Sequence, residues 1–294
     1  MRGLQPTVGD PVLHTLVVVT RLVTFAGGSV RWLLAGRRLA KQASRSGWFD
    51  SVHHWTPKDL DAQIPQFRLD NPNLAPEESR GFGYWLWRPY ILGMELASMS
   101  KGECLLFLDA GCQLNQNQQS EVRFRTYVDT ANEYGSLIME INEPIDKWCK
   151  RDLLQEFALG DCSSQLLLVE PGVFFLTKTE TNQALVADWI KWGRTQNHHY
   201  LDDSPSRVPE LSTFQEHRHD QAILTCLSTQ YPIHKIPQET YFPQKWSELG
   251  SPYPIWALRN STPFDLESGG IVSEVISKWR RRSNKFPRRT HQHR

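Results

Sequence analysis

The chain has 294 residues, of which 39% are hydrophobic and 11% aromatic, enough for one large globular domain or two small ones; we expect one. Its 33 lysine and arginine residues nearly balance its 32 aspartate and glutamate residues, so the overall charge does not favour a nucleic-acid-binding protein. The cysteines number five, an odd count, and include no Cys-x-x-Cys pair. This pattern argues against a zinc site or a disulfide framework and favours a reducing compartment, the cytoplasm.

The two ends of the chain differ from its middle. The apolar segment over 14–40 is interrupted by Arg21 and Arg31, short of the roughly 20 apolar residues that a membrane span needs, and it lacks the features of a signal peptide. The arginine-rich sequence SKWRRRSNKFPRRTHQHR has no apolar period, which favours a disordered, solvated tail over a segment bound to an anionic membrane. We therefore expect an N-terminal extension at 1–14, a single domain at 15–262 and a basic tail at 263–294.

The domain begins with a predicted strand, turn, helix and strand. Residues 15–26 are rich in β-branched side chains, and a helical spacing of apolar residues follows from Val30 to a stop at Ser46-Gly47. Residues 48–55 supply a second short strand, which completes a βαβ unit. The first turn, Ala26-Gly27, allows a ligand to approach the backbone, although it lacks the three-glycine dinucleotide fingerprint and is also compatible with a plain helix start.

Strands and helices keep alternating along the rest of the domain. The sequence predicts a surface loop over 56–80 with one short helical stretch, and a loop-rich C-terminal lid beyond Tyr231. Between them we expect helices from Pro89 to Met99, over 118–133, 150–158 and 180–194 and from His219, and strands over 104–109, 135–141 and 165–177. This alternation predicts an α/β sandwich with a mainly parallel sheet flanked by helices.

Residues 80–112, RGFGYWLWRPYILGMELASMSKGECLLFLDAGC, carry most of the chemical information. An aromatic cluster bracketed by Arg80 and Arg88 leads into an apolar run that ends on Asp109, and ligands bind at that end of the strands in open α/β sheets. Trp85 and Trp87 are suited to stacking on a sugar or base, with filling of the core as the structural alternative.

The strand that ends in Asp109-Ala-Gly-Cys resembles the metal-binding Asp-x-Asp element of glycosyltransferases with the glycosyltransferase-A fold, a Rossmann-like sandwich. There, two aspartates hold the manganese or magnesium ion that bridges the diphosphate of a nucleotide-sugar donor. Here Gly111 occupies the second acidic position. The resemblance implies either that Asp109 binds the metal with help from His234 or another carboxylate, or that Arg80, Arg88 or Lys150 meets the diphosphate charge.

Two later motifs are similar to elements of the same family, in the same order. VEPGVFFL over 169–176 looks like the acceptor-side strand of glycogenin-like and galactosyltransferase members, and Asp220-Gln221 looks like the Asp-Gln that begins a later helix in many retaining members. The combination over roughly 20–245 is similar to bacterial glycosyltransferases of surface-polysaccharide clusters, most of whose substrates are unassigned.

The resemblance implies a role for each of these residues. Asp220 would orient the donor sugar or the acceptor, and Gln221 would lie beside the anomeric carbon. Donor-binding residues would be Ala26, Gly27, Arg80, Trp85, Trp87, Arg88, Asp109 and Gly111; acceptor-side residues would be Glu170, Gly172 and His219. We expect Asp109→Ala and Asp220→Ala to abolish transfer while preserving the thermal midpoint, because both residues lie at element ends. The structural alternatives are a helix cap for Asp109 and a helix-dipole contact for Asp220.

Two whole-protein hypotheses follow. The first is a hexosyltransferase that moves a sugar to a glycan or lipid-linked acceptor in cell-surface polysaccharide synthesis, in the cytoplasm or at the inner face of the membrane. The second is a catalytically degenerate module of the same fold that binds a glycan or nucleotide. We interpret other polar runs as surface features: His53-His54, His198-His199 and Lys150-Arg151-Asp152.

Overall fold

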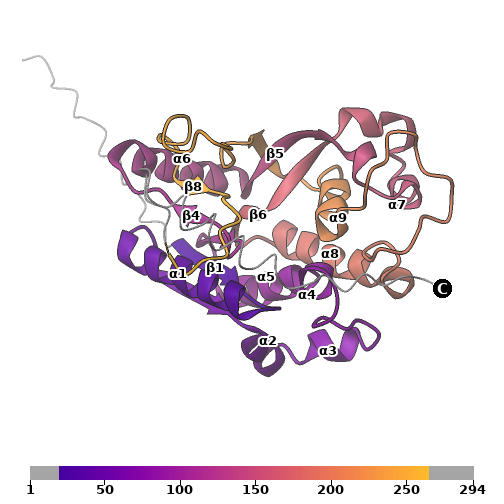
Figure 1. Cartoon of the computed structure of the whole chain (residues 1–294), viewed down its shortest axis with the longest axis horizontal. Helices are drawn as coiled ribbons and strands as arrows, with labels where there is room; N and C mark the ends of the chain where they lie inside the picture. Colours follow the sequence, from indigo (N-terminus) through magenta and orange to yellow (C-terminus); the bar gives the residue numbers. More distant parts are fainter. Residues whose placement is uncertain (1–19, 265–294) are drawn as a thin grey trace, which may run out of the picture.

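The computed structural model describes residues 20–264, which form a six-stranded sheet with helices on both faces (Figure 1). The strand order is β2-β1-β3-β6-β5-β7. β1 is parallel to β2 and β3, and β5 is parallel to β7, whereas β6 runs antiparallel to both of its neighbours. A mainly parallel α/β sheet is therefore confirmed. The extension expected at 1–14, the start of the strand expected at 15–26 and the basic tail from 265 onward lie outside the described residues.

The elements have the following bounds. The strands of the main sheet are β1 (Thr20–Phe25), β2 (Ser51–Trp55), β3 (Cys104–Leu108), β5 (Ser136–Pro144), β6 (Leu167–Thr177) and β7 (His234–Pro237). A separate pair is formed by β4 (Gln113–Leu114) and β8 (Ile255–Trp256). The helices are α1 (Val30–Ser46), α2 (Pro57–Gln63), α3 (Gln66–Asp70), α4 (Gly81–Tyr84), α5 (Trp87–Ser98), α6 (Gln118–Tyr134), α7 (Arg151–Glu156), α8 (Glu180–His198) and α9 (His219–Leu227), with 3-10 turns at Ile145–Lys147 and Gly160–Gln165.

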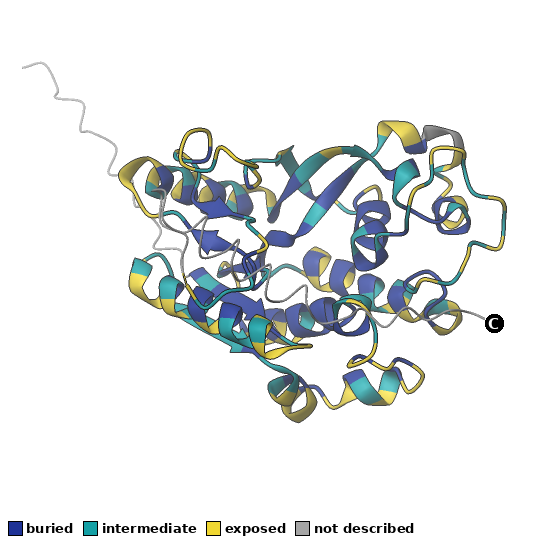
Figure 2. Ribbon diagram, viewed as in Figure 1, coloured by how far each residue is buried: buried dark blue, intermediate teal, exposed yellow. Residues whose placement is uncertain are grey.

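Each face of the sheet has its own hydrophobic core, because successive side chains of a strand point to opposite faces. Leu105 and Phe107 of β3 pack with residues of α5, α8 and α9, while Leu106 and Leu108 pack with residues of α1 and α6. The central strand β3 is buried at every residue, and most of the neighbouring strand residues are buried as well (Figure 2). Burial on both faces explains why β3 reads as a continuous apolar run in the sequence.

The predicted βαβ unit is confirmed by the parallel pairing of β1 with β2. The side chain of Ser29 caps the start of α1, and Gly47, in a left-handed conformation (φ 73°), ends it. The region over 56–80 contains two helices where one short stretch was expected. The first, α2, has a capping box between Thr56 and Asp59 and Pro57 at its first position, signals that the many prolines and charges of the region conceal.

The C-terminal part of the chain packs onto the sheet at two places. β7 extends the sheet beside β5, and β8 pairs with β4 just after the end of β3. Within the described residues, no helix combines the length and the apolar character needed to cross a bilayer.

The aromatic cluster adopts an unusual backbone. Gly81, Phe82, Gly83, Tyr84 and Trp85 all have positive φ values, between 52° and 88°. A non-glycine residue in this region costs about 1–3 kcal/mol and persists only where its surroundings hold it. Phe82 is 6% exposed, and the ring of Trp85 lies so close to Gly81 that a Cβ there would come within 2.3 Å of it. The surrounding packing therefore holds this left-handed turn in front of α5.

Candidate functional site

A buried arginine links the two aspartates that the sequence singled out. Arg88, in the first turn of α5, is 2% exposed. Its Nη2 donates to Oδ1 of Asp109 at 2.9 Å, and its Nη1 donates to Oδ2 of Asp220. Residues from three separate elements thus meet beyond the carboxyl end of β3, where the topology predicts a ligand site.

The two carboxylates differ in their exposure to solvent. The side chain of Asp109 is 42% exposed, whereas that of Asp220 is 4% exposed. Asp220 lies in the first turn of α9, where the helix dipole also favours a negative charge. Asp109 is therefore the carboxylate available to a ligand, and Asp220 holds Arg88 in place. Because Asp220 is buried, its place at a helix end is no longer a reason to expect that Asp220→Ala preserves the thermal midpoint.

The turn after β3 is tightly built around Asp109. The backbone N–H of Asp109 donates to the carbonyl of Gly172 at 2.9 Å, and a Cβ at Gly172 would lie 2.5 Å from Oδ2 of Asp109. Arg38 of α1, which is 6% exposed, donates to the carbonyls of Ala110 and Cys112 at 3.1 and 2.6 Å. Gly172 thus makes room for the carboxylate, and Arg38 holds the turn that carries it.

Gln221 and the turn Ala26-Gly27 both have structural contacts near the site. Gln221 donates through Nε2 to the carbonyl of Val169 on β6 at 2.8 Å, which ties α9 to the sheet. Ala26 and Gly27 follow β1 at the same carboxyl edge as Asp109, and a Cβ at Gly27 would lie 2.8 Å from the ring of Phe25. The glycine there serves close packing within the turn.

The two tryptophans have different environments. Trp87 is 4% exposed and stacks on Phe25 with ring centroids 4.0 Å apart, so it belongs to the core. Trp85 is partly exposed and stacks on the imidazole of His219 at 5.7 Å. Of the pair, Trp85 is the one that could still contact a sugar or base.

Glu170 and His219, two of the three expected acceptor-side residues, are both held by neighbouring groups. The carboxylate of Glu170 accepts hydrogen bonds from Thr240 at 2.5 Å and Gln238 at 3.2 Å; desolvation raises its pKa, and the charge of Asp109 acts in the same direction. His219 is 2% exposed, donates through Nδ1 to the carbonyl of Leu201 at 2.8 Å, and has a pKa lowered by burial.

Several polar residues expected at the surface are buried instead. Lys150 is 1% exposed, and its Nζ contacts the carbonyl of His199, Asp202 and Ser204. His199 pairs through Nε2 with Asp152 at 2.5 Å, and His198 pairs with Asn71 at 2.8 Å. The prediction of surface positions was wrong here because long-range partners, which sequence spacing does not reveal, satisfy these groups. Lys150 is thereby engaged in anchoring the loop after α8.

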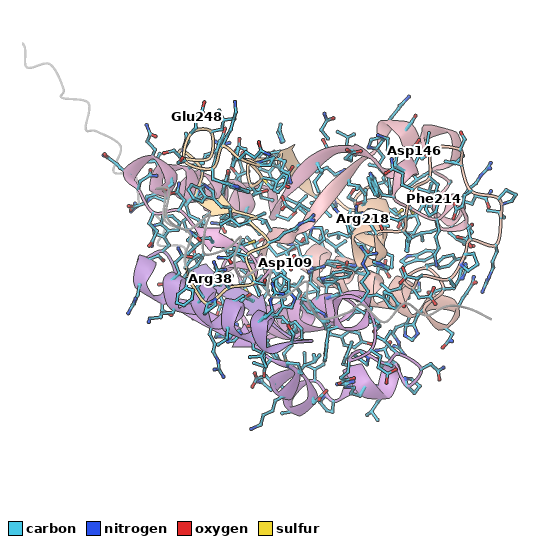
Figure 3. All side chains as sticks on the ribbon, viewed as in Figure 1. Arg38, Asp109, Asp146, Phe214, Arg218 and Glu248 are labelled. Carbon is cyan, nitrogen blue, oxygen red and sulfur yellow. The ribbon has the colours of Figure 1, made fainter. Side chains whose placement is uncertain are left out.

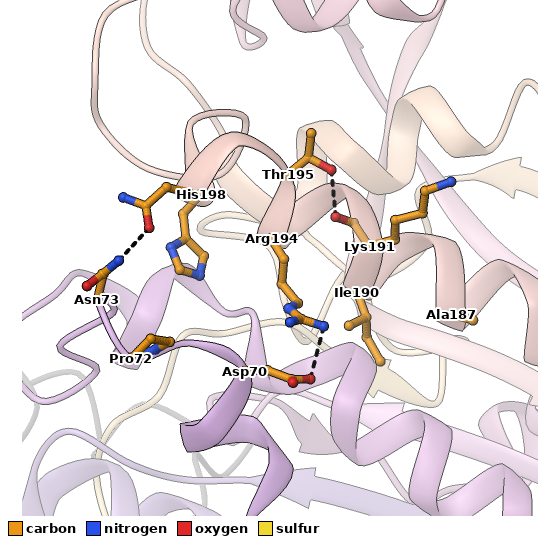
Figure 4. A pocket seen from close by; sticks show the side chains of 10 residues that line it. Asp70, Pro72, Asn73, Ala187, Ile190, Lys191, Arg194, Thr195 and His198 are labelled. Atoms are coloured by element: carbon orange, nitrogen blue, oxygen red, sulfur yellow. Dashed lines mark hydrogen bonds and ion pairs between the residues drawn. The ribbon is translucent and has the colours of Figure 1, made fainter.

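Two cavities lie near these buried groups. One, of about 560 Å³, lies between α3 and the end of α8, and its polar groups already pair with one another: Asp70 with Arg194 at 3.0 Å and Asn73 with Asn197 at 2.8 Å (Figure 4). The other, of about 650 Å³, is lined by Lys150, the loop over 203–210, Phe214, Glu216 and His217. The second cavity adjoins the start of α9 and hence the side of the molecule where Asp220 lies.

The residues around Asp109 do not form a preformed divalent metal site. One oxygen of Asp109 is engaged by Arg88, and His234 on β7 is separated from β3 by two intervening strands of the sheet. A Cβ at Gly111 would lie 2.9 Å from Cα of Arg259, so no acidic side chain fits there without a shift of the backbone. Among residues 20–264, no three His, Cys, Asp or Glu side chains are placed to hold a metal ion together.

Three arginines with exposed or partly exposed side chains lie around the site. Arg80 precedes α4, Arg218 precedes α9, and Arg259 lies in the C-terminal segment that packs on Gly111. In the view of Figure 3, Arg38 and Arg218 lie on opposite sides of Asp109. Of these three, only Arg80 was predicted from the sequence. The place of Arg218 next to His219-Asp220 was an available signal, whereas nothing local distinguishes Arg259.

The fold and the site together define an α/β protein with a cluster of charged residues, a candidate ligand site, at the carboxyl edge of its sheet. No family model matches the chain, and a search of curated proteins finds no match. Among solved structures, the chain is similar to mouse xyloside xylosyltransferase 1 in its apo form, at 12% identity and a TM-score of 0.44, over 84% of this chain and 100% of that one.

Two further solved structures are similar at the same level. A glycosyltransferase involved in glycosylation of the major capsid of PBCV-1 has 10% identity and a TM-score of 0.45, over 90% of this chain and 99% of that one. The galactosyltransferase LgtC, in complex with donor and acceptor sugar analogs, has 10% identity and a TM-score of 0.43, over 84% of each chain. These are glycosyltransferases, the class that the sequence resembles. At such identities and scores the activity has to be argued from the site itself.

Proposed function

We propose that this chain is a nucleotide-sugar-dependent glycosyltransferase whose central reactive group is Asp109. The observation that carries the proposal is the link made by Arg88 between Asp109, at a strand end, and Asp220, at a helix start. A half-exposed carboxylate held by a buried cation is fixed in position and remains accessible to a ligand. Sugar transfer needs such a group, because positive charge develops at the anomeric carbon while the diphosphate leaves.

In this proposal, each part of the site has one task. Asp109 faces the donor sugar, Arg88 and Asp220 hold its carboxylate, and Ala26-Gly27 allows the donor to approach the carboxyl edge of β1. Trp85 offers a ring face to the sugar or the base. In this proposal the group transferred is a hexose, as the hexosyltransferase hypothesis expects.

We place the acceptor in the cavity of about 650 Å³ beside the start of α9. Its size suits a small carbohydrate, and its lining contributes hydroxyl, carboxylate and guanidinium groups from Ser204, Ser206, Arg207 and Glu210. Such a lining fits the hydroxyl groups of a glycan or of the sugar on a lipid-linked acceptor. Synthesis of a cell-surface polysaccharide, a cytoplasmic location and membrane contact through the tail stay predictions.

The test is nucleotide release from a panel of UDP, GDP, CMP and dTDP sugars, with and without manganese, in the presence of oligosaccharide acceptors. We expect turnover with one nucleotide class and a loss of at least about 100-fold in Asp109→Asn. Asp129→Asn, an exposed aspartate on α6, is the matched control and should retain full activity. Binding of glycans or nucleotides without turnover by any donor would instead identify the degenerate binding module.

A further inference from the structure

The backbone of the C-terminal segment packs on Gly111, the position of the missing second acid. The backbone N–H of Asn260 donates to the carbonyl of Gly111 at 2.9 Å, which seats Arg259 directly over the turn after Asp109. Because a Cβ at Gly111 would lie 2.9 Å from Cα of Arg259, a side chain at position 111 and Arg259 in its present place are mutually exclusive. The backbone of Arg259 therefore takes up the space in which an acidic side chain at position 111 would lie.

Arg259 is held there in a strained conformation. Its φ is 53°, a left-handed value that is unfavourable for a residue with a side chain. Its side chain is exposed. Desolvation lowers the pKa of Arg218, and the charge of Arg259 acts in the same direction; at Glu170, whose pKa is raised by desolvation, the charge of Arg259 opposes that rise.

Arg218 and Arg80 bring two more guanidinium groups to the same side. Arg218 lies over the ring of Trp148 at 4.3 Å from its centroid, a cation–π contact that orients the group. Arg218 and Arg80 share a single carboxylate, Glu216, at 3.0 and 3.5 Å. The pKa of Arg218 is lowered by desolvation, and the charges of Arg80 and Arg259 act in the same direction, so each of these two arginines repels Arg218.

The nearby carboxylates leave this cluster positive. Glu216 is the counter-ion of two arginines, and Glu143, which also acts on Arg218, pairs with Lys147 at 3.2 Å. Glu170 accepts hydrogen bonds from Gln238 and Thr240. Repulsion among like charges is relieved when a ligand with several negative charges binds, and guanidinium groups bind phosphate oxygens through pairs of N–H donors.

We propose that Arg80, Arg218 and Arg259 form a diphosphate-binding site, in which guanidinium groups neutralise the charge that a metal ion neutralises in the Asp-x-Asp element. The ligand class is a diphosphate ester, as found in nucleotide-sugar donors and in prenyl-diphosphate-linked sugars. This inference rests on the proposed function for its link to sugar transfer, and the anion site itself is testable without turnover.

The experiment measures binding by calorimetry in EDTA, with inorganic pyrophosphate, UDP, GDP and geranyl diphosphate as probes. We expect at least one diphosphate to bind without metal. Arg218→Gln and Arg259→Gln should each weaken its binding about tenfold or more, because each removes a charged donor of a phosphate contact. Arg125→Gln is the matched control, since Arg125 is 73% exposed and pairs with Glu121 on α6 away from the site. It should leave binding unchanged.

The outcomes separate the anion site from the proposed function. Tighter binding of UDP or GDP than of geranyl diphosphate assigns the site to the donor, and the reverse order assigns it to a lipid-linked acceptor. Diphosphate binding that fails in the arginine variants, without turnover of any sugar nucleotide, supports the anion site and contradicts the transferase. Binding that requires manganese and is unchanged in both variants overturns the anion site, as does the absence of binding by every probe.

Discussion

The buried Arg88 and the more exposed arginines Arg80, Arg218 and Arg259 differ in what surrounds their charges. Arg88 is 2% exposed and contacts two carboxylates, so its charge is neutralised inside the protein. Arg80 and Arg218 have side chains 45% and 30% exposed and share one carboxylate, and Arg259 adds a third positive charge. From the sequence, Arg80 and Arg88 were both expected to be phosphate contacts. They differ in burial. A buried arginine that contacts two carboxylates holds the site in place, whereas exposed arginines that outnumber their carboxylates can attract an anionic ligand.

The largest expected effect comes from removing the buried cation. Arg88→Met leaves Asp220 buried without its partner, and breaking a buried ion pair in this way costs about 3–5 kcal/mol of unfolding free energy. Arg80→Met should cost about 1 kcal/mol or less, because surface ion pairs contribute little. Urea unfolding of both variants measures the difference. Equal losses would mean that burial does not distinguish the two groups.

A smaller contrast is expected between the two carboxylates of Arg88. Asp220→Asn removes a charge partner that is 4% exposed and should lower the unfolding free energy by about 3 kcal/mol, whereas Asp109→Asn, at a position 42% exposed, should lower it by about 1 kcal/mol. Thermal or urea unfolding tests both. An unchanged midpoint in Asp220→Asn would restore the expectation drawn from its place at a helix end.

The unfolding free energy should also depend on pH, because the protein contains buried histidines. His217 accepts the N–H of Lys150 at Nδ1 and contacts the carbonyl of Tyr200 through Nε2, an arrangement that suits the neutral ring, and burial lowers its pKa well below the usual value. As pH falls below about 6.5, the unfolded chain takes up a proton that the folded ring resists, so stability falls.

For this single histidine, the loss between pH 7.5 and 5.5 should be about 1 kcal/mol. Burial also lowers the pKa of His54, His198 and His219, so each of them also makes the protein less stable as the pH falls. Urea unfolding at the two pH values measures the change, and His217→Gln should reduce it. The same pH dependence in that variant would assign the effect to the other histidines.

The smallest effect concerns the one carboxylate of the exposed cluster. Glu216→Gln removes the negative charge shared by Arg80 and Arg218 and should tighten pyrophosphate binding about threefold at low salt, with less effect at high salt. Glu121→Gln, on the exposed face of α6, is the matched control. Weaker binding in Glu216→Gln would show that its carboxylate orients the arginines more than it opposes the ligand.

Much of the architecture could be predicted because its signals are local. The glycine and serine at the start of α1, the apolar run of β3 and the position of Asp109 at its end all follow from neighbouring residues. The alternation of strands and helices along the chain, which predicts a mainly parallel sheet, is also a local signal. The helices α2 and α3 were underestimated because prolines and charges hide a short amphipathic pattern.

The sequence by itself therefore determined the class of fold, the edge of the sheet that carries the candidate site and the two aspartates of interest. The tertiary structure alone decided that Arg88 joins Asp220, 132 residues away, and that Arg259 lies over Gly111. It also decided which arginine is buried and which are exposed. Local propensity depends on neighbours along the chain, whereas the charge state and freedom of a side chain depend on the distant groups that pack around it.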